Sequence, residues 1–368
     1  MKTIKHTLLG ALLLSAFAVS PASAQMRPDP NQPDMTLSAA QRNQVIDAMV
    51  AELHKSYVFP EQAKKVDALI RQHQKKGDYN SITSAAKLST TLTEHVFEQT
   101  RDKHLRLFYS AQPIPEQQKD KKPSAEEHQQ MLAGMQSQNF GVERVERLPF
   151  NIGYLDLRAF APAKDSAETI AAAMTLLAHT DSLIIDLRKN GGGDPATVTM
   201  LASYLLDERT HMTDIYFREG DRTEQMWSSD AVQGARFGQK KDVYVLTSKN
   251  TFSAAEDFSY ALKGLKRITL VGETTGGGAH PGDVMRLNQN FAMFVPNGRS
   301  IGPVTKANWE GVGVAPHVSV TAEDALKTAQ IAILKKLAAA EKNPGKVERI
   351  NTRIAKVDSE NTAGTMAR

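Results

Sequence analysis

The sequence predicts an α/β fold preceded by a small helical domain, and three observations support this. Strand-like and helical segments alternate between Gly153 and Val295, which is typical of a sheet with parallel crossovers. Residues 36–101 show three helical patterns instead. The 368 residues are 41% hydrophobic and 23% charged, which is a globular composition. Collagen-like, low-complexity and wholly disordered chains are therefore excluded.

The first 24 residues have the three parts of a secretory signal peptide. Lys2 and Lys5 form a positive start, Leu8–Val19 is an apolar run, and Ala22–Ala24 is a small-residue cleavage site. The apolar run is too short to span a bilayer. We therefore expect cleavage after Ala24, a periplasmic or secreted protein, and no stable membrane insertion once the signal peptide is removed.

The helical N-terminal domain is expected over residues 36–101. Before it, residues 25–35 are rich in proline and indicate an extended linker. Ser38 and the glutamine three residues later match a capping box, and apolar residues follow at helical spacing. Pro60 suits the first turn of a second helix, and a third helical pattern covers about residues 82–99.

The pattern changes after the third helix. Residues 104–109 alternate between two faces, as a strand does. Residues 112–138 are polar and rich in Lys, Glu and Gln, which indicates a loop, a linker or a solvated helix. This segment is too short for an inserted regulatory domain.

The second half carries the α/β pattern and ends in an Ala/Lys-rich helical segment. Strands are expected over 153–157, 183–187, 243–247, 268–271 and 291–295, and helices over 167–179, 195–206 and 253–266. We expect an α/β domain over residues 102–320. A C-terminal helix and a flexible tail are expected over residues 321–368.

Composition excludes several kinds of site. The chain has no cysteine, so disulfides, thiolate zinc sites, iron–sulfur clusters and a cysteine nucleophile are excluded. The net charge is +4, but no Lys/Arg run is long enough to follow a phosphate backbone, so no nucleic-acid partner is expected. No His/Asp/Glu group has metal-ligand spacing. We therefore expect neither a metal nor a cofactor.

Ser253 lies where the strand over 243–247 gives way to a helix. Its hydroxyl is then beside unpaired backbone N–H groups and the positive end of the helix dipole. These conditions favour an oxyanion during acyl transfer. Ser253 and Glu256 also match a capping box. The local sequence thus supports two roles for this serine, a nucleophile and a helix cap.

A glycine turn, Asn190–Gly193, follows the strand over 183–187. Glycine lets the backbone approach a ligand closely and direct an N–H group toward it. A plain tight turn and a phosphate cradle are the alternatives. Gly191, Gly193 and Ala196 superficially match the dinucleotide fingerprint, but charged residues stand where that motif needs an immediate turn, and no Walker lysine follows. Nucleotide binding is therefore disfavoured.

Two histidines and one glutamate are candidates for acid–base chemistry. His104 lies on the non-leucine face of its expected strand, and His280 lies in a glycine-rich segment closer in sequence to Ser253. Glu310 stands in a turn-like segment, where a solvated carboxylate is the commoner outcome. Local sequence alone leaves their roles open.

Six segments occur in an order and spacing that resemble a known family. They are Asp102–His104, Gly153–Leu157, Asp186–Gly193, Thr251–Glu256, Val271–Gly276 and Glu310–Pro316. Together they resemble the tail-specific (C-terminal-processing) serine protease family. The likeness is greatest to its branch with tricorn protease and the repeats of interphotoreceptor retinoid-binding protein. The resemblance implies a ClpP/crotonase-like β-β-α core sheet with helices.

The resemblance also implies catalytic roles. Ser253 would be the nucleophile that forms an acyl-enzyme, His104 would take its proton, and Glu310 would orient and charge the imidazole. This is the Ser-His-Glu relay of the tricorn-like branch.

Other roles follow from the same resemblance. The backbone N–H groups of Gly192 and Ala254 would form the oxyanion hole. Gly191, Gly193 and His280 are candidate substrate-binding residues.

The chain departs from the family pattern at several positions. Gly278 stands where many members have the lysine of a serine–lysine dyad, so that dyad is not expected. Lys103 stands where tricorn has a serine, which removes the fourth member of its relay. No PDZ-like module is evident between His104 and Gly153.

The sequence therefore favours a periplasmic or exported serine peptidase that acts on peptides or proteins. The alternative is a non-catalytic binding protein for a hydrophobic ligand or peptide on the same fold, because fold does not determine function. An esterase that uses the same residues is a weaker third hypothesis.

Overall fold

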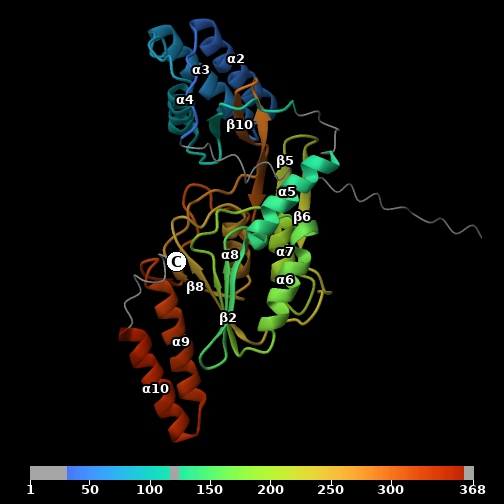
Figure 1. Ribbon diagram of the computed structural model, residues 1–368, viewed down its shortest axis with the longest axis vertical. Coiled ribbons are helices and arrows are strands. Elements are labelled where there is room, and N and C mark those ends of the chain that lie inside the picture. The colour runs from blue at the N-terminus through green and yellow to red at the C-terminus, as the bar shows by residue number, and fades with distance from the viewer. Residues whose placement is uncertain (1–30, 117–123, 360–368) are drawn as a thin grey trace, which may run out of the picture.

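The computed structural model describes residues 31–116 and 124–359. The expected signal peptide and most of the expected linker lie outside these residues. A helical unit, an α/β body and a helical hairpin follow one another along the long axis (Figure 1). Within the described chain, no helix has both the length and the apolar character needed to cross a membrane.

Three helices form most of the N-terminal unit, as the sequence predicted. They are α2 (Ala39–Ser56), α3 (Pro60–Lys76) and α4 (Ala85–Thr100). Ser38 and Gln41 close the expected capping box of α2. Helix α3 begins at Pro60 and ends at Gly77, whose φ of 83° is the left-handed conformation that glycine adopts easily.

A three-stranded antiparallel sheet completes this unit, and part of it comes from far along the chain. Its order is β1 (Arg106–Tyr109), β10 (Phe291–Pro296) and β9 (Gly282–Arg286). Leu107 pairs with Met293, and both lie in the apolar core of the helical unit. The expected strand over 291–295 thus exists but joins this small sheet. Its apolar pattern could not specify which sheet it would enter.

The α/β body has a six-stranded sheet of order β12-β8-β7-β4-β3-β2. The strands are β2 (Val142–Leu148), β3 (Ile152–Leu157), β4 (Ser182–Asp186), β7 (Asp242–Thr247), β8 (Thr269–Gly272) and β12 (Val318–Ser319). Strand β2 is antiparallel to β3, and the other neighbours are parallel. The α/β class with a helical N-terminal region is therefore confirmed.

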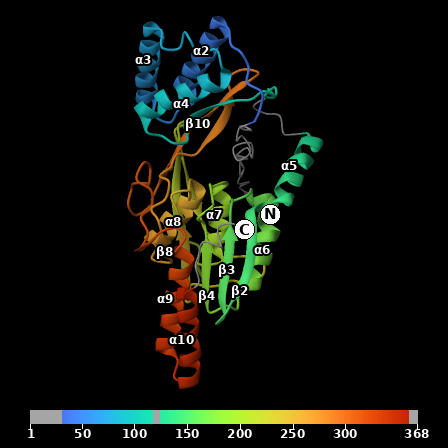
Figure 2. The same cartoon turned by 60° about the vertical axis from the view of Figure 1, so that its left-hand side comes forward.

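Helices cover both faces of this sheet (Figure 2). One face packs against α6 (Ala163–Leu177), α7 (Pro195–Ser203) and α8 (Ala254–Gly264), and the other against α9 (Ala325–Ala340). In β4, Leu183 and Ile185 face the first layer and Ile184 faces the second. Two covered faces explain why the three central residues of β4 are all apolar.

Two peripheral helices differ in detail from what the sequence predicted. Residues 344–359, expected to be a flexible tail, form α10 (Pro344–Ser359), which buries Ile350 and Val357 in the core shared with α9. Helix α5 (Ala125–Ser137) buries no residue, and is thus the solvated helix among the three expected alternatives. The remaining elements are η1 (Asn139–Gly141) and a small sheet of β11 (Gly298–Ile301), β5 (His211–Phe217) and β6 (Arg222–Trp227).

The parallel strands bring three loops to one edge of the sheet. Strand β4 leads into Asn190–Gly193, β7 into Ser253, and β8 into residues 273–280. The carboxyl ends of parallel strands are where sites of open α/β sheets assemble. The fold therefore places the expected nucleophile and the glycine turn side by side.

Candidate active site

Ser253 occupies a sharp turn between β7 and α8. Its φ of 56° and ψ of −121° are rare for a residue with a side chain, and it directly precedes the first residue of the helix. A serine on a strained strand-to-helix turn is the geometry of a nucleophile elbow. The serine is half-buried. The turn thus sets the hydroxyl apart from the helical backbone that follows.

The carboxylate of Glu256 holds this turn against the loop after β8. It accepts hydrogen bonds from the backbone N–H groups of Ser253 (2.9 Å), Gly277 (2.6 Å) and Gly278 (2.8 Å) and from the Thr275 hydroxyl (2.5 Å). Burial raises the pKa of Glu256, and these hydrogen bonds offset the rise only in part. Glu256 thus fixes the backbone of Ser253, the candidate nucleophile.

The glycine turn touches Ser253, but Gly192 does not offer its N–H group. A Cβ atom at Gly192 would lie 2.7 Å from the Ser253 Cβ and 3.1 Å from the Ala254 nitrogen. However, the Gly192 N–H donates to Asn190 Oδ1 at 2.8 Å. The expected assignment of Gly192 as an oxyanion-hole donor is therefore corrected, because a side-chain amide that the motif itself supplies already occupies that donor.

Two neighbouring N–H groups remain without a hydrogen-bond partner among the described residues, those of Ala254 and Gly193. The Gly192 carbonyl and the Asp194 N–H both bond to Phe160. The C=O and N–H of one trans peptide point in opposite directions, and the Gly192 carbonyl accepts from Phe160, so the Gly193 N–H points away from Phe160. Gly191 and Gly193 are exposed, as residues that meet a ligand would be.

His104 lies beside the residue that precedes the nucleophile. Its ring packs against Phe252, with centroids 4.5 Å apart, and against Phe294 at 5.6 Å. Only 7% of His104 is exposed, and its Nδ1 atom has no hydrogen-bond partner. Burial lowers the pKa of His104 to about 4, although the charge of Asp102 opposes this shift. The imidazole is therefore neutral at neutral pH.

His104 and Phe252 also explain the glycine at position 278. A Cβ atom there would lie 2.2 Å from the Phe252 ring and 2.7 Å from His104 Cε1. No side chain fits at those distances. The two rings thus fill the space that a dyad lysine would cross.

Glu310 contacts His280 and not the histidine that was expected. Its Oε2 atom accepts the Ala279 N–H at 2.5 Å and lies 3.4 Å from His280 Nδ1. His280 Nδ1 also lies 2.8 Å from Asp102 Oδ2. The expected direct Glu310–His104 contact is therefore corrected. His280 is 6% exposed, so it belongs to this buried group and not to an open substrate surface.

Asp102 joins the two histidines. Its Oδ1 accepts the backbone N–H of His104 at 3.0 Å, and its Oδ2 accepts the Tyr57 hydroxyl at 3.2 Å. Burial raises the pKa of Asp102, but the hydrogen bond and charge of His280 outweigh burial and hold it below its usual value. Burial and the Asp102 charge raise the pKa of Glu310 to about 7. Asp102 is thus ionised while Glu310 titrates near neutrality.

The same group has the spacing that a metal ion would need. The ligand atoms of Asp102, His280 and Glu310 all lie within 4.8 Å of one another, and no other group in the described ranges meets this criterion. The contacts between His280 and the two carboxylates account for the arrangement without an ion.

Several residues of the site were missed by sequence reasoning. Tyr57 and Phe59 come from the end of α2 and the loop after it, and Phe59 meets the His280 ring edge-on at 5.0 Å. Lys103 donates from its ammonium group to the Gly276 carbonyl at 2.6 Å. The position of Asp102, two residues before His104, could have indicated that it lies near this histidine. No local sequence pattern indicated that Tyr57 belongs to the site.

Comparisons with known proteins agree with this architecture. Peptidase family S41 matches residues 151–320, and the N-terminal domain of peptidase S41 in eukaryotic IRBP matches residues 35–142. The chain belongs to peptidase family S41. The family inferred from the six motifs is confirmed, and carboxyl-terminal-processing members of S41 are serine peptidases.

Two sequence relatives come from Arabidopsis thaliana. Carboxyl-terminal-processing peptidase 2, chloroplastic, is 27% identical over 165 residues, which are 45% of this chain and 31% of that protein. Carboxyl-terminal-processing peptidase 3, chloroplastic, is 29% identical over 172 residues, 46% of this chain and 31% of that protein. The S41 chain thus spans about a third of the length of these relatives.

Solved structures show the same fold at low identity. A lipoprotein from Streptococcus agalactiae has a TM-score of 0.53 and 14% identity, over 82% of this chain and 97% of that one. A candidate peptidase from Parabacteroides merdae has a TM-score of 0.52 and 18% identity, over 76% and 90%.

We predict that Glu256→Ala lowers the free energy of unfolding by about 2–4 kcal/mol, because four donors lose a buried acceptor. Urea unfolding followed by circular dichroism measures this. Glu273→Ala is the matched control, since Glu273 lies in the same loop, is partly exposed, and accepts from Lys249. A Glu256→Ala variant as stable as the control would contradict the role given to Glu256.

Proposed function

We propose that this S41 chain is a periplasmic or exported serine peptidase that hydrolyses peptide bonds through an acyl-enzyme on Ser253. The strained turn at the start of α8, with the glycine turn packed against it, is the observation that carries the proposal. The three-part leader sequence supports the location.

In this mechanism, the Ser253 oxygen attacks the substrate carbonyl while its proton passes to the neutral imidazole of His104. The oxyanion is stabilised by the N–H groups of Ala254 and Gly193, which have no hydrogen-bond partner in residues 31–116 and 124–359. His104 then protonates the leaving amine. Water attacks the acyl-enzyme in the second half of the reaction.

The carboxylates act on His104 through positioning and charge. Asp102 holds the His104 backbone and the His280 ring at once. Glu310 lies 3.4 Å from His280 Nδ1, the same ring nitrogen that contacts Asp102. The Ser-His-Glu relay is thus proposed with Asp102 and His280 between its histidine and its glutamate. A negative charge nearby stabilises the imidazolium that forms when the serine proton is taken.

One observation favours the alternative of a non-catalytic binding protein for a hydrophobic ligand or peptide. No hydrogen bond joins His104 to the Ser253 hydroxyl among the described residues, and His104 is packed between aromatic rings. Labelling with a fluorophosphonate separates the two functions. A peptidase is labelled at Ser253, whereas a binder with an unactivated serine is not labelled.

We predict that Ser253→Ala abolishes hydrolysis of a casein and peptide panel, because the attacking oxygen is gone, while stability changes by only about 1 kcal/mol. Turnover and thermal unfolding are measured on the same preparation. Turnover at the native level would show that the nucleophile is another residue.

No lysine is expected to act as the base. Lys263 donates to the Ala315 carbonyl at 2.6 Å, and Lys103 donates to the Gly276 carbonyl. We predict that the double variant Lys263→Ala, Lys266→Ala keeps kcat within about threefold of the native value, and that Lys103→Ala does the same. Loss of an acid–base residue would lower kcat by far more than that. A loss from either variant as large as that of Ser253→Ala would revive a lysine dyad.

The two histidines are expected to differ. His104→Ala should remove nearly all activity, because no other imidazole packs against Phe252 next to the nucleophile. His280→Ala should reduce activity less, since it loosens Asp102 without removing the base. If His280→Ala were inactive while His104→Ala kept its pH profile, the relay would run through His280 instead.

The pH profile separates His104 from Glu310. A base must be neutral to accept a proton, so kcat/KM should rise as pH passes about 4, where His104 loses its proton. A second rise is expected near pH 7, where Glu310 ionises and supplies negative charge. In Glu310→Gln the second rise should disappear and the first should remain. An unchanged profile would exclude Glu310 from the relay.

A further inference from the structure

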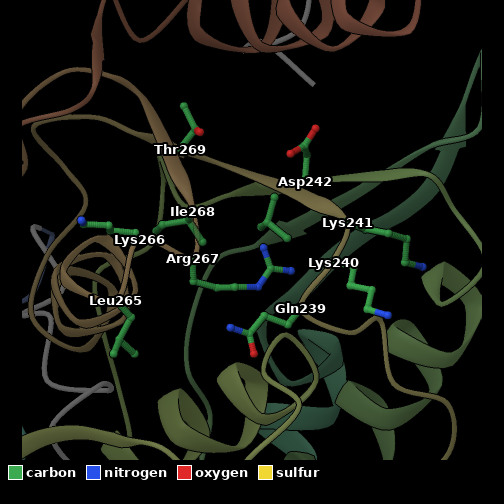
Figure 3. A pocket seen from close by; sticks show the side chains of 10 residues that line it. Gln239, Lys240, Lys241, Asp242, Leu265, Lys266, Arg267, Ile268 and Thr269 are labelled. Carbon is green, nitrogen blue, oxygen red and sulfur yellow. The ribbon is translucent and has the colours of Figure 1, made fainter. Parts of the chain in front are cut away.

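A pocket of about 230 Å³ lies at the edge of the main sheet opposite the active site. It is lined by Gln239–Val243, which lead into β7, and by Leu265–Thr269, which lead into β8 (Figure 3). Ser253 follows the other end of β7. A strand of six residues separates the two ends by about 20 Å. The pocket is therefore distinct from the site of hydrolysis.

The lining carries an excess of positive charge. Four cationic residues contribute to it, Lys240, Lys241, Lys266 and Arg267, against one acidic residue, Asp242. The carboxylate of Asp242 is already paired, since Lys336 from α9 lies 2.6 Å from it. Asp242 thus pairs with Lys336, which is not a lining residue, and not with a cation of the pocket.

Arg267 is the most buried of these cations, with 8% of its surface exposed. Its Nε donates to the Leu205 carbonyl at 2.6 Å and its Nη2 to the Gly238 carbonyl at 2.8 Å. Both acceptors are neutral, and no hydrogen bond of the described residues uses Nη1. Burial lowers the pKa of Arg267, and the more distant charges of Asp207 and Asp242 oppose this only in part. In Figure 3 the guanidinium group points into the pocket.

Lys241 has the same kind of environment. Its ammonium group donates to the carbonyls of Ala178 (2.5 Å) and Thr180 (3.1 Å) and lies 4.0 Å from the centre of the Phe237 ring. Burial lowers its pKa as well, and the charge of Asp181 opposes this only in part. Two cations that are partly or largely removed from water, both bonded to carbonyls and not to carboxylates, are unfavourable unless an anion is nearby.

We propose that this pocket binds a small multivalent oxyanion of the phosphate class. Arg267 supplies the free N–H group at its base, and Lys240, Lys241 and Lys266 of the lining add positive charge at longer range, with their side chains directed away from the guanidinium group (Figure 3). Arg and Lys donors form charge-assisted hydrogen bonds to such oxygens. The volume suits inorganic phosphate or the phosphate end of a small phosphomonoester. The bound anion would link the loop before β7 to the loop before β8.

Isothermal titration calorimetry with inorganic phosphate tests the proposal on the purified protein. Sodium chloride at matched ionic strength controls for screening of surface charge. We expect saturable binding of one phosphate per chain, and a melting temperature that rises with phosphate but not with chloride. The same titration with glycerol 3-phosphate asks whether the pocket accepts a substituted phosphate. Failure of both anions to bind would overturn the proposal.

Variants locate the binding. Arg267→Gln should abolish phosphate binding, and the double variant Lys240→Gln, Lys266→Gln should weaken it by about tenfold through lost charge. The double variant keeps the proposal testable if Arg267→Gln does not fold, because both lysines are exposed. Lys335→Gln, an exposed lysine of α9, is the matched control and should bind as the native protein does. Native binding in the double variant would place the anion elsewhere.

Discussion

One buried carboxylate, that of Glu256, holds the candidate site together. It bonds at once to the backbone of the nucleophile's turn and to two peptide N–H groups in the loop after β8. The two segments follow different parallel strands, β7 and β8, and are therefore distant along the chain. A carboxylate offers two acceptor oxygens and no donor, whereas a glutamine of the same size offers one acceptor oxygen and an NH₂ donor. Its four donors offset much of the cost of burying the charge. The strained backbone of Ser253 therefore persists because this acceptor determines where its N–H group must lie.

A second carboxylate, Asp102, connects the helical unit to the site. Tyr57, at the end of α2, and His280 both contact its Oδ2 atom, and the backbone N–H of His104 donates to its Oδ1 atom. The small sheet of β1, β10 and β9 fixes this geometry, because His104 immediately precedes the β1 region and His280 precedes β9. The N-terminal unit is thus part of the site and not an appendage. One aspartate thus connects Tyr57 of this unit to the His280 ring and to the His104 backbone.

The sequence predicted much of this molecule, and its failures have a common cause. Local periodicity located the three helices of the N-terminal unit and the parallel strands β3, β4, β7 and β8, because each pattern is set by neighbours a few residues apart. It missed α10 and the short strand β12. Motifs also identified Ser253, His104 and Glu310 as candidates. The wrong assignments concern partners. Glu310 was assigned to His104, because a contact between distant segments produces no periodic pattern in the sequence. Gly192 was assigned a free N–H group, because the hydrogen bond from this group to the Asn190 side chain produces no such pattern either. The strand over 291–295 entered an unexpected sheet for the same reason.

The glycine at position 278 shows how such long-range geometry constrains the chemistry. The loop that carries it is fixed by Glu256 at its N–H group and by the Trp309 indole, which donates to its carbonyl at 2.7 Å. The loop therefore cannot move away from the Phe252 and His104 rings, which stand closer than any Cβ atom allows. A lysine at this position and a histidine at position 104 compete for one volume. A side chain at position 278 would therefore have to displace the Phe252 ring or the His104 ring from this dense packing.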